Sequence, residues 1–255
     1  FSESLNKEHD IGYRLGQQIT KEDMSLILSM CKTGQNEPFY MNVIRAFFKK
    51  NGIGMLKEII DFPEDFQLIS FIFRCAPFTQ ELIELVPKYL PGHEEMFWKA
   101  VQVPTYYSSY EDYDAIAVAE TLMQYHRTPA AIILISDAIN DLHPDPHLIC
   151  NMLVQAPNEQ QVEKIDPVST RELIKYLQVS DVIERDILGQ IEFFYLVWLD
   201  EYSEVKPKAI EFLLANDPAC FCKLMETAYR KRNDLSEHKN LPEAISERIF
   251  QITFQ

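Results

Sequence analysis

The amino-acid sequence predicts an all-α fold in which antiparallel helix pairs stack in chain order as an α-solenoid. Three observations lead to this prediction. Apolar residues recur at helical spacing in several segments, rather than alternating with the period of a strand. Capping residues followed by proline mark helix starts, and the 255-residue chain has only 7 glycines, which leaves few positions for tight turns.

Helical periodicity is clearest at residues 81–90. Six apolar residues there form one stripe on a helix: Leu82, Ile83, Leu85, Val86, Tyr89 and Leu90. Similar stripes recur within 187–198 and 221–229. The segment 64–75 is apolar nearly all round, so we expect other elements to cover it on both sides. The run 130–135 also suits a buried strand, but it follows Thr128-Pro129 and continues in helical register, which favours a helix.

Helix boundaries follow from capping residues, prolines and glycines. A capping side chain precedes a proline at Thr128-Pro129, Asp145-Pro146 and Asp217-Pro218. Thr20 and Asp23 have the spacing of a capping box, and helices should end at Gly34, Gly52 and Gly92. Together these signals predict helices at residues 4–18, 21–33, 37–50, 53–61, 64–75, 78–90, 93–102, 112–126, 129–142, 146–156, 168–178, 181–199, 206–215, 218–232 and 242–253.

Short connectors between these helices predict antiparallel neighbours, which stack most simply as a HEAT- or TPR-like superhelix. We therefore expect residues 1–255 to form a single helical-repeat domain. Irregular stretches interrupt the pattern at 103–111 and 157–167, and the second is the candidate subdomain boundary. The chain begins at Phe1 without a methionine, which indicates a piece of a longer polypeptide.

The composition narrows the possible classes of partner and the cellular compartment. A formal net charge of −15 argues against nucleic acid, whose binding depends on lysine and arginine. The longest apolar run, 193–199, is far shorter than the ~20 residues that span a bilayer, so we expect no membrane partner. Five cysteines, an odd number scattered through predicted helices, indicate a reducing compartment and hence the cytoplasm: Cys31, Cys75, Cys150, Cys220 and Cys222.

Three stretches, taken in order, resemble a known architecture. They are 93–99 (HEEMFWK) followed by 103–107 (VPTYY), 125–131 (YHRTPAA), and 213–221 (LLANDPACF) running on to Tyr229. Over about two thirds of the chain this order resembles the C-terminal helical-repeat region of large multidomain prokaryotic NTPase-like proteins, some of them linked to defence. The resemblance implies a helical architecture and a nucleotide-binding module upstream of it. It carries no active-site residue over to this chain.

Motifs for catalysis, metals and cofactors are incomplete. Lys32-Thr33-Gly34 lacks the order and the preceding glycine of a phosphate-binding loop, so a helix C-cap is favoured. The segment 143–147 (HPDPH), with Cys150 beyond it, could bind a metal, but its two prolines favour a turn in which Asp145 caps the next helix. Cys220 and Cys222 would point about 200° apart on a helix, so they cannot bind one metal ion together. The His9-Asp10 pair resembles part of a metal-dependent phosphohydrolase site, but that site needs an earlier histidine, which this chain lacks. We therefore predict no catalytic residue, metal site or cofactor.

An aromatic and acidic stretch is the best candidate for a contact surface. Tyrosine and tryptophan offer large contact areas at a small cost in side-chain entropy. The candidate binding residues are Trp98, Tyr106, Tyr107, Tyr110 and Tyr113. In the alternative interpretation, Tyr106 and Tyr107 cover the ends of neighbouring helices.

The sequence thus predicts a non-catalytic interaction, scaffold or sensor segment that binds another protein or another domain of its own chain. The alternative is a small helical metal-dependent hydrolase, which stoichiometric zinc, manganese or iron in the purified protein would support. A nucleic-acid sensor is a third hypothesis, and it requires DNA binding that survives ~150 mM salt.

Overall fold

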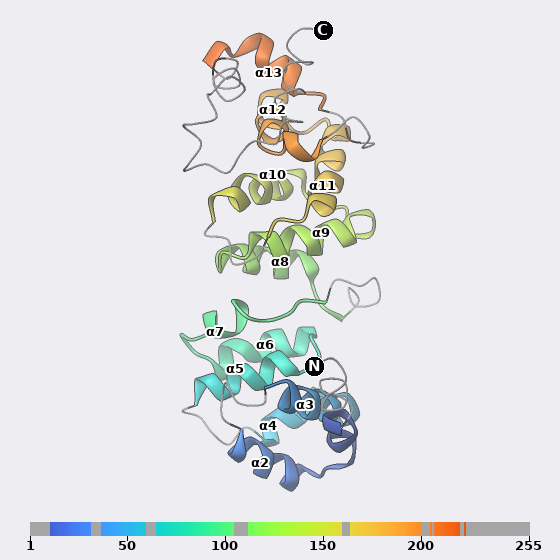
Figure 1. Cartoon of the computed structure of the whole chain (residues 1–255), viewed down its shortest axis with the longest axis vertical. Coiled ribbons are helices and arrows are strands. Elements are labelled where there is room, and N and C mark those ends of the chain that lie inside the picture. The colour runs from blue at the N-terminus through green and yellow to red at the C-terminus, as the bar shows by residue number, and fades with distance from the viewer. Residues whose placement is uncertain are drawn as a thin grey trace, which may run out of the picture. The chain divides into compact units, whose positions relative to one another are not determined.

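The computed structural model describes residues 11–31, 37–59, 65–104, 112–159, 164–199, 205, 207–219 and 222 (Figure 1). All regular secondary structure in these ranges is helical, so the all-α prediction is confirmed. Among the described residues, no helix combines the length and the apolar character needed to cross a membrane. Contacts divide the chain into two compact units, Phe1–His126 (unit 1) and Arg127–Gln255 (unit 2). The predicted boundary near 157–167 lies inside unit 2.

The first described helix of unit 1 spans residues 11–18. Further elements follow in chain order: α2 (Lys21–Met30), α3 (Glu37–Asn51), the 3₁₀ turn η1 (Ile53–Met55), α4 (Leu56–Ile59), α5 (Phe66–Cys75), α6 (Gln80–Tyr89), α7 (Glu95–Trp98) and α8 (Ala115–Gln124). The predicted capping box is present, because the Thr20 hydroxyl accepts from the Asp23 N–H and the Asp23 carboxylate accepts from the Thr20 N–H. The helix expected at 93–102 is much shorter, since turns flank α7 on both sides.

The first helix of unit 1 packs closely on α3 through two glycines. A Cβ atom at Gly12 would lie 2.9 Å from the Phe39 carbonyl oxygen. At Gly16 it would lie 2.2 Å from the Val43 carbonyl oxygen and 2.8 Å from the Ala46 Cβ. Because real Cβ atoms essentially never approach other atoms so closely, only glycine allows the two helix backbones to come together here.

Helix α5 lies at the centre of the unit 1 core, as its apolar sequence predicts. Residues Leu68 through Phe73 are buried, and α5 contacts α3, α6 and α7. Aromatic rings from α5 and from later segments of unit 1 pack against one another in this core. The Phe73 ring meets Phe97 edge to face at 6.3 Å between ring centroids, and the Phe78 ring meets Tyr113 edge to face at 4.9 Å. Such rings bury large apolar areas in a fixed geometry.

Unit 2 contains α9 (Thr128–Leu142), α10 (Pro146–Gln155), η3 (Ala156–Asn158), α11 (Pro167–Val179), α12 (Arg185–Phe194), η4 (Leu196–Trp198) and α13 (Ile210–Asn216). The run 130–135 lies inside α9, so its helical prediction is confirmed. Asp145 caps α10 by accepting from the His147 N–H, which confirms the predicted turn. Thr128 is the first residue of α9 rather than its side-chain cap, and its N–H and hydroxyl donate instead to the Glu159 carboxylate.

A second carboxylate joins two helices of unit 2. Glu192 on α12 is completely buried and accepts hydrogen bonds from the backbone N–H groups of Lys208, Ala209 and Ile210, at 2.7–2.9 Å. The side-chain amide of Gln178 on α11 is a fourth donor at 2.7 Å. Glu192 therefore satisfies N–H groups at the start of α13, which a helix cannot pair internally.

Candidate functional site

The predicted aromatic contact surface falls partly in the core. Trp98 and Tyr113 are each only 5% exposed, and both rings pack edge to face on Phe78. The Tyr113 hydroxyl donates to the Pro104 carbonyl oxygen at 2.9 Å. These two side chains offer little surface to a partner, because unit 1 already covers them. The other three predicted binding residues lie outside the described residues: Tyr106, Tyr107 and Tyr110.

The segment 143–147 is a connection between two helices. His143 adopts a left-handed conformation with φ of 43° at the end of α9, and Asp145 caps α10. No group of three His, Cys, Asp or Glu side chains that could share a metal ion occurs within the part of the chain that the structure describes. Residues 9–10 and 32–34, which were also considered in the sequence, lie outside that part.

Burial makes two cysteines poor nucleophiles. Desolvation raises the pKa of the Cys75 thiol to about 12, although the positive charges of Arg74 and Arg45 oppose this rise. Burial, with a smaller contribution from Asp145, raises the pKa of the Cys150 thiol to about 11. Because the thiolate is the reactive form, both thiols are protonated and unreactive at neutral pH. Cys31, Cys75, Cys150 and Cys222 are all free cysteines.

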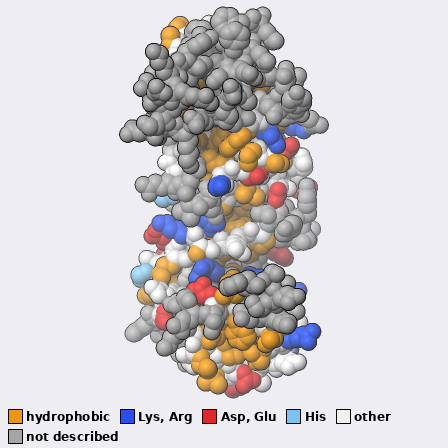
Figure 2. Space-filling model, in the orientation of Figure 1, with side chains coloured by type: hydrophobic (Ala, Val, Ile, Leu, Met, Phe, Trp, Pro, Cys, Tyr) orange, Lys and Arg blue, Asp and Glu red, His pale blue; other side chains and the backbone are white. Residues whose placement is uncertain are grey.

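Helix α2 has two apolar faces, and only one of them is covered. Met24 and Leu28 are 0% and 1% exposed, whereas Leu26 and Met30 are 61% and 62% exposed. Two residues along a helix turn the side-chain direction by about 200°, so each pair lies on its own side of α2. We call Leu26 and Met30 the outer face of α2. Figure 2 shows hydrophobic side chains gathered over the part of unit 1 that contains this helix.

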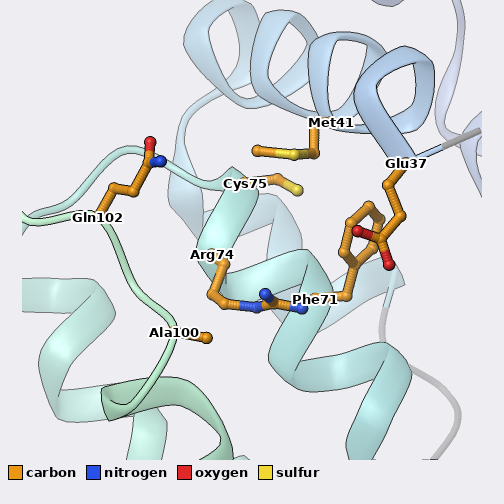
Figure 3. A pocket seen from close by; sticks show the side chains of 7 residues that line it. All are labelled: Glu37, Met41, Phe71, Arg74, Cys75, Ala100 and Gln102. Carbon is orange, nitrogen blue, oxygen red and sulfur yellow. The ribbon is translucent and has the colours of Figure 1, made fainter. Parts of the chain in front are cut away.

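A pocket of about 170 Å³ opens between α3, α5 and the segment after α7 (Figure 3). We call it the Arg74 pocket, and it is lined by Glu37, Met41, Phe71, Arg74, Cys75, Ala100 and Gln102. Phe71 and Cys75 are buried and form its deep part. Ala100 and Gln102 are exposed and form its rim. The walls are therefore mixed, because apolar side chains and polar or charged side chains line the pocket in about equal measure.

Arg74 is the charged group of α5 that reaches into this pocket. In Figure 3 its side chain passes between Met41 and Cys75 on one side and Ala100 on the other. The centre of its guanidinium lies 5.7 Å from the centroid of the Phe71 ring. The Nε atom is buried and has no hydrogen-bond partner among the described residues. Nε itself has almost no accessible surface, so an acceptor that enters the pocket would meet the terminal N–H groups of the Arg74 guanidinium.

Comparison with models of known protein families, with curated proteins and with solved structures gives no match to this chain. The resemblance to NTPase-like proteins therefore stays a prediction.

Sequence reasoning missed both the outer face of α2 and the Arg74 pocket. A signal for the first was present, because Met24, Leu26, Leu28 and Met30 place apolar residues on two sides of one short helix. A signal for the second was Arg74, the single charged residue in the mostly apolar segment 66–75. The pocket itself depends on residues from 37 to 102 meeting in space, which no local pattern indicates.

Proposed function

We propose that this chain is a non-catalytic interaction segment, a scaffold or sensor within a larger protein, which binds another protein or another domain of its own chain. In this proposal successive helix pairs stack as an α-solenoid, an architecture that presents many helix faces along one chain. The observation that carries the proposal is the outer face of α2, formed by Leu26 and Met30 on a helix already anchored by its opposite side. The resemblance of residues 62–232 to helical regions of larger proteins is consistent with it.

The energetics support such a role for the outer face. Burying one large aliphatic side chain contributes about 1.5–3 kcal/mol, so covering Leu26 and Met30 together would contribute about 3–6 kcal/mol before entropic costs. The helix beneath them is well fixed, because it has a complete capping box and two fully buried residues on its inner side. A rigid helix loses little freedom when a partner packs on it.

Charge indicates the kind of partner. The chain has a net charge of −15, and Glu22 and Asp23 lie in the first turn of α2. Complementary charges accelerate association and favour one partner over others. We therefore propose an amphipathic helix as the partner element, with an apolar stripe that packs on the outer face and lysine or arginine beside that stripe.

The test is capture from native cell extract by the immobilised chain, with variants that change only exposed side chains. The double variant Leu26→Gln/Met30→Gln should lower the affinity for the captured protein at least about tenfold, since it removes both apolar anchors. It should leave the thermal unfolding of the chain almost unchanged, because both side chains are exposed.

A matched control uses exposed aliphatic residues of unit 2. Val179 and Val182 are 72% and 59% exposed, so Val179→Gln/Val182→Gln makes a similar change in polarity elsewhere. The control should retain the captured protein, and binding by the wild type should weaken as salt is added. If both double variants retain the captured protein equally well, the proposal is contradicted. Sedimentation of the chain alone distinguishes a second copy from a different protein as the partner.

A further inference from the structure

The Arg74 pocket combines a cavity, an unpaired buried donor and an apolar wall, and these features are independent of the proposed function. The pocket encloses about 170 Å³. A buried cavity of about 150 Å³ in another protein holds one benzene molecule, so the Arg74 pocket has room for a ligand of roughly that size. Its deep part is formed by the ring of Phe71 and the thiol of Cys75, and the side chain of Met41 comes from α3 (Figure 3).

The donor in the pocket selects the polar end of a ligand. The guanidinium of Arg74 carries donors in a planar fork that matches a carboxylate, and its buried Nε atom lacks a partner within the described residues. The cation lies beside the Phe71 ring at 5.7 Å, which orients it without using its N–H groups. A carboxylate in the pocket would accept from the terminal N–H groups of Arg74, in charge-assisted hydrogen bonds.

The remaining polar groups limit the charge of the ligand. Glu37, in the first turn of α3, also lines the pocket, so a second negative charge on the ligand would be repelled. The Cys75 thiol has a pKa of about 12 because of its burial, and it therefore adds no charge at neutral pH. At the exposed rim, the Gln102 amide can donate to the same carboxylate or to a second polar group.

We propose that the Arg74 pocket binds a small monocarboxylate, with the carboxylate on Arg74 and a short aromatic or branched apolar part between Phe71 and Met41. Two kinds of molecule share this chemistry. A simple carboxylic acid would use Arg74 alone, whereas an α-amino acid would also place its ammonium group toward Glu37.

Binding of defined compounds to the purified chain tests the proposal. Titration calorimetry or ligand-observed NMR with benzoate, 3-methylbutanoate and phenylalanine should give a dissociation constant at or below about 1 mM for at least one of them. Benzyl alcohol and 3-methylbutanol, which lack the carboxylate, should bind at least about tenfold more weakly, since a hydrogen bond to a charged group is stronger than a neutral one. Tighter binding of phenylalanine than of benzoate would identify the amino-acid class.

Two variants connect the binding to this pocket. Arg74→Met keeps a similar apolar volume and removes the donors, and it should raise the dissociation constant about ten- to a hundredfold. Arg185→Gln is the matched control, because the Arg185 guanidinium also stands beside a phenylalanine ring, that of Phe212 at 5.9 Å, but does not line the pocket. It should bind like the wild type.

A third variant fills the pocket from its rim. Ala100 is exposed, so Ala100→Trp places a large ring at the mouth without disturbing the core, and it should abolish binding while the chain still unfolds cooperatively. The proposal is overturned if none of the three carboxylates binds at about 10 mM, which would indicate a pocket filled with water only. It is also overturned if alcohols and carboxylates bind equally, or if Arg74→Met binds as tightly as the wild type.

Discussion

Unit 1 is organised around aromatic rings and local helix caps, whereas unit 2 adds to its own local caps, at Asp145 and Asp166, carboxylates that bind helix starts far along the chain. In unit 1, Asp65, Thr79 and Asp114 each cap the helix that follows them directly. In unit 2, Glu159 accepts from Thr128, 31 residues away, and Glu192 accepts from Ile210, 18 residues away. Unit 1 should therefore be most sensitive to lost side-chain volume, and unit 2 to lost hydrogen-bond acceptors.

Removing a core ring should have the largest effect. Phe73 is fully buried and packs on both Tyr89 and Phe97, so Phe73→Ala should lower the free energy of unfolding by about 3–5 kcal/mol. Amide hydrogen exchange should accelerate in peptides of unit 1. Phe194→Ala is the control, since Phe194 is 60% exposed, and it should cost less than about 0.5 kcal/mol. Equal costs would show that the aromatic core does not hold unit 1 together.

Removing the buried carboxylate of Glu192 in unit 2 should have the second largest effect on stability. Glu192→Ala leaves three backbone N–H groups and the Gln178 amide without their acceptor, and we expect a loss of about 3 kcal/mol with faster exchange in unit 2. The exposed Glu184, which makes no side-chain cap at the start of α12, provides the control variant Glu184→Ala. If the two glutamate variants unfold at the same denaturant concentration, the capping role of Glu192 is wrong.

Close helix packing in unit 1 should be tested by adding one methyl group. In Gly16→Ala the new Cβ would meet backbone atoms of Val43, so we expect a loss of about 1–3 kcal/mol. Gly54→Ala adds the same methyl group where no atom lies within 4 Å, and it should be neutral or slightly stabilising. Chemical denaturation of both variants measures the difference, and a Gly16→Ala protein as stable as the wild type would contradict the close approach.

The smallest expected effect is a pH-dependent one in unit 2. Burial, with a smaller contribution from the nearby Asp166, raises the pKa of the Asp137 carboxyl. Because the folded-state pKa is above the unfolded value of about 3.9, ionised Asp137 disfavours the folded state as the pH rises. Asp137→Asn should therefore raise the melting temperature slightly at pH 7. The gain should vanish below about pH 4, where the carboxyl is protonated in both states. A gain that persists there would have another cause.

The extent to which the sequence predicted the molecule depends on the distance between the interacting residues. Helix periods and local caps were predicted correctly, as at Thr20 with Asp23 and at Asp145, because their partners lie within one turn. The cap on Thr128 was assigned to its own side chain, because the true acceptor, Glu159, is 31 residues away. Trp98 and Tyr113 were predicted to be contact residues, but they are buried because both rings pack on Phe78. Phe78 is distant from both in the sequence, so no local pattern indicates this contact.

The proposed role in protein interaction depends most on the outer face of α2. Hydrogen–deuterium exchange of the chain, alone and with the captured protein, tests this most directly. We predict slower exchange in peptides that cover residues 21–30, and no such protection with the Leu26→Gln/Met30→Gln variant. Protection confined to other helices, with residues 21–30 exchanging as in the free chain, would contradict the account.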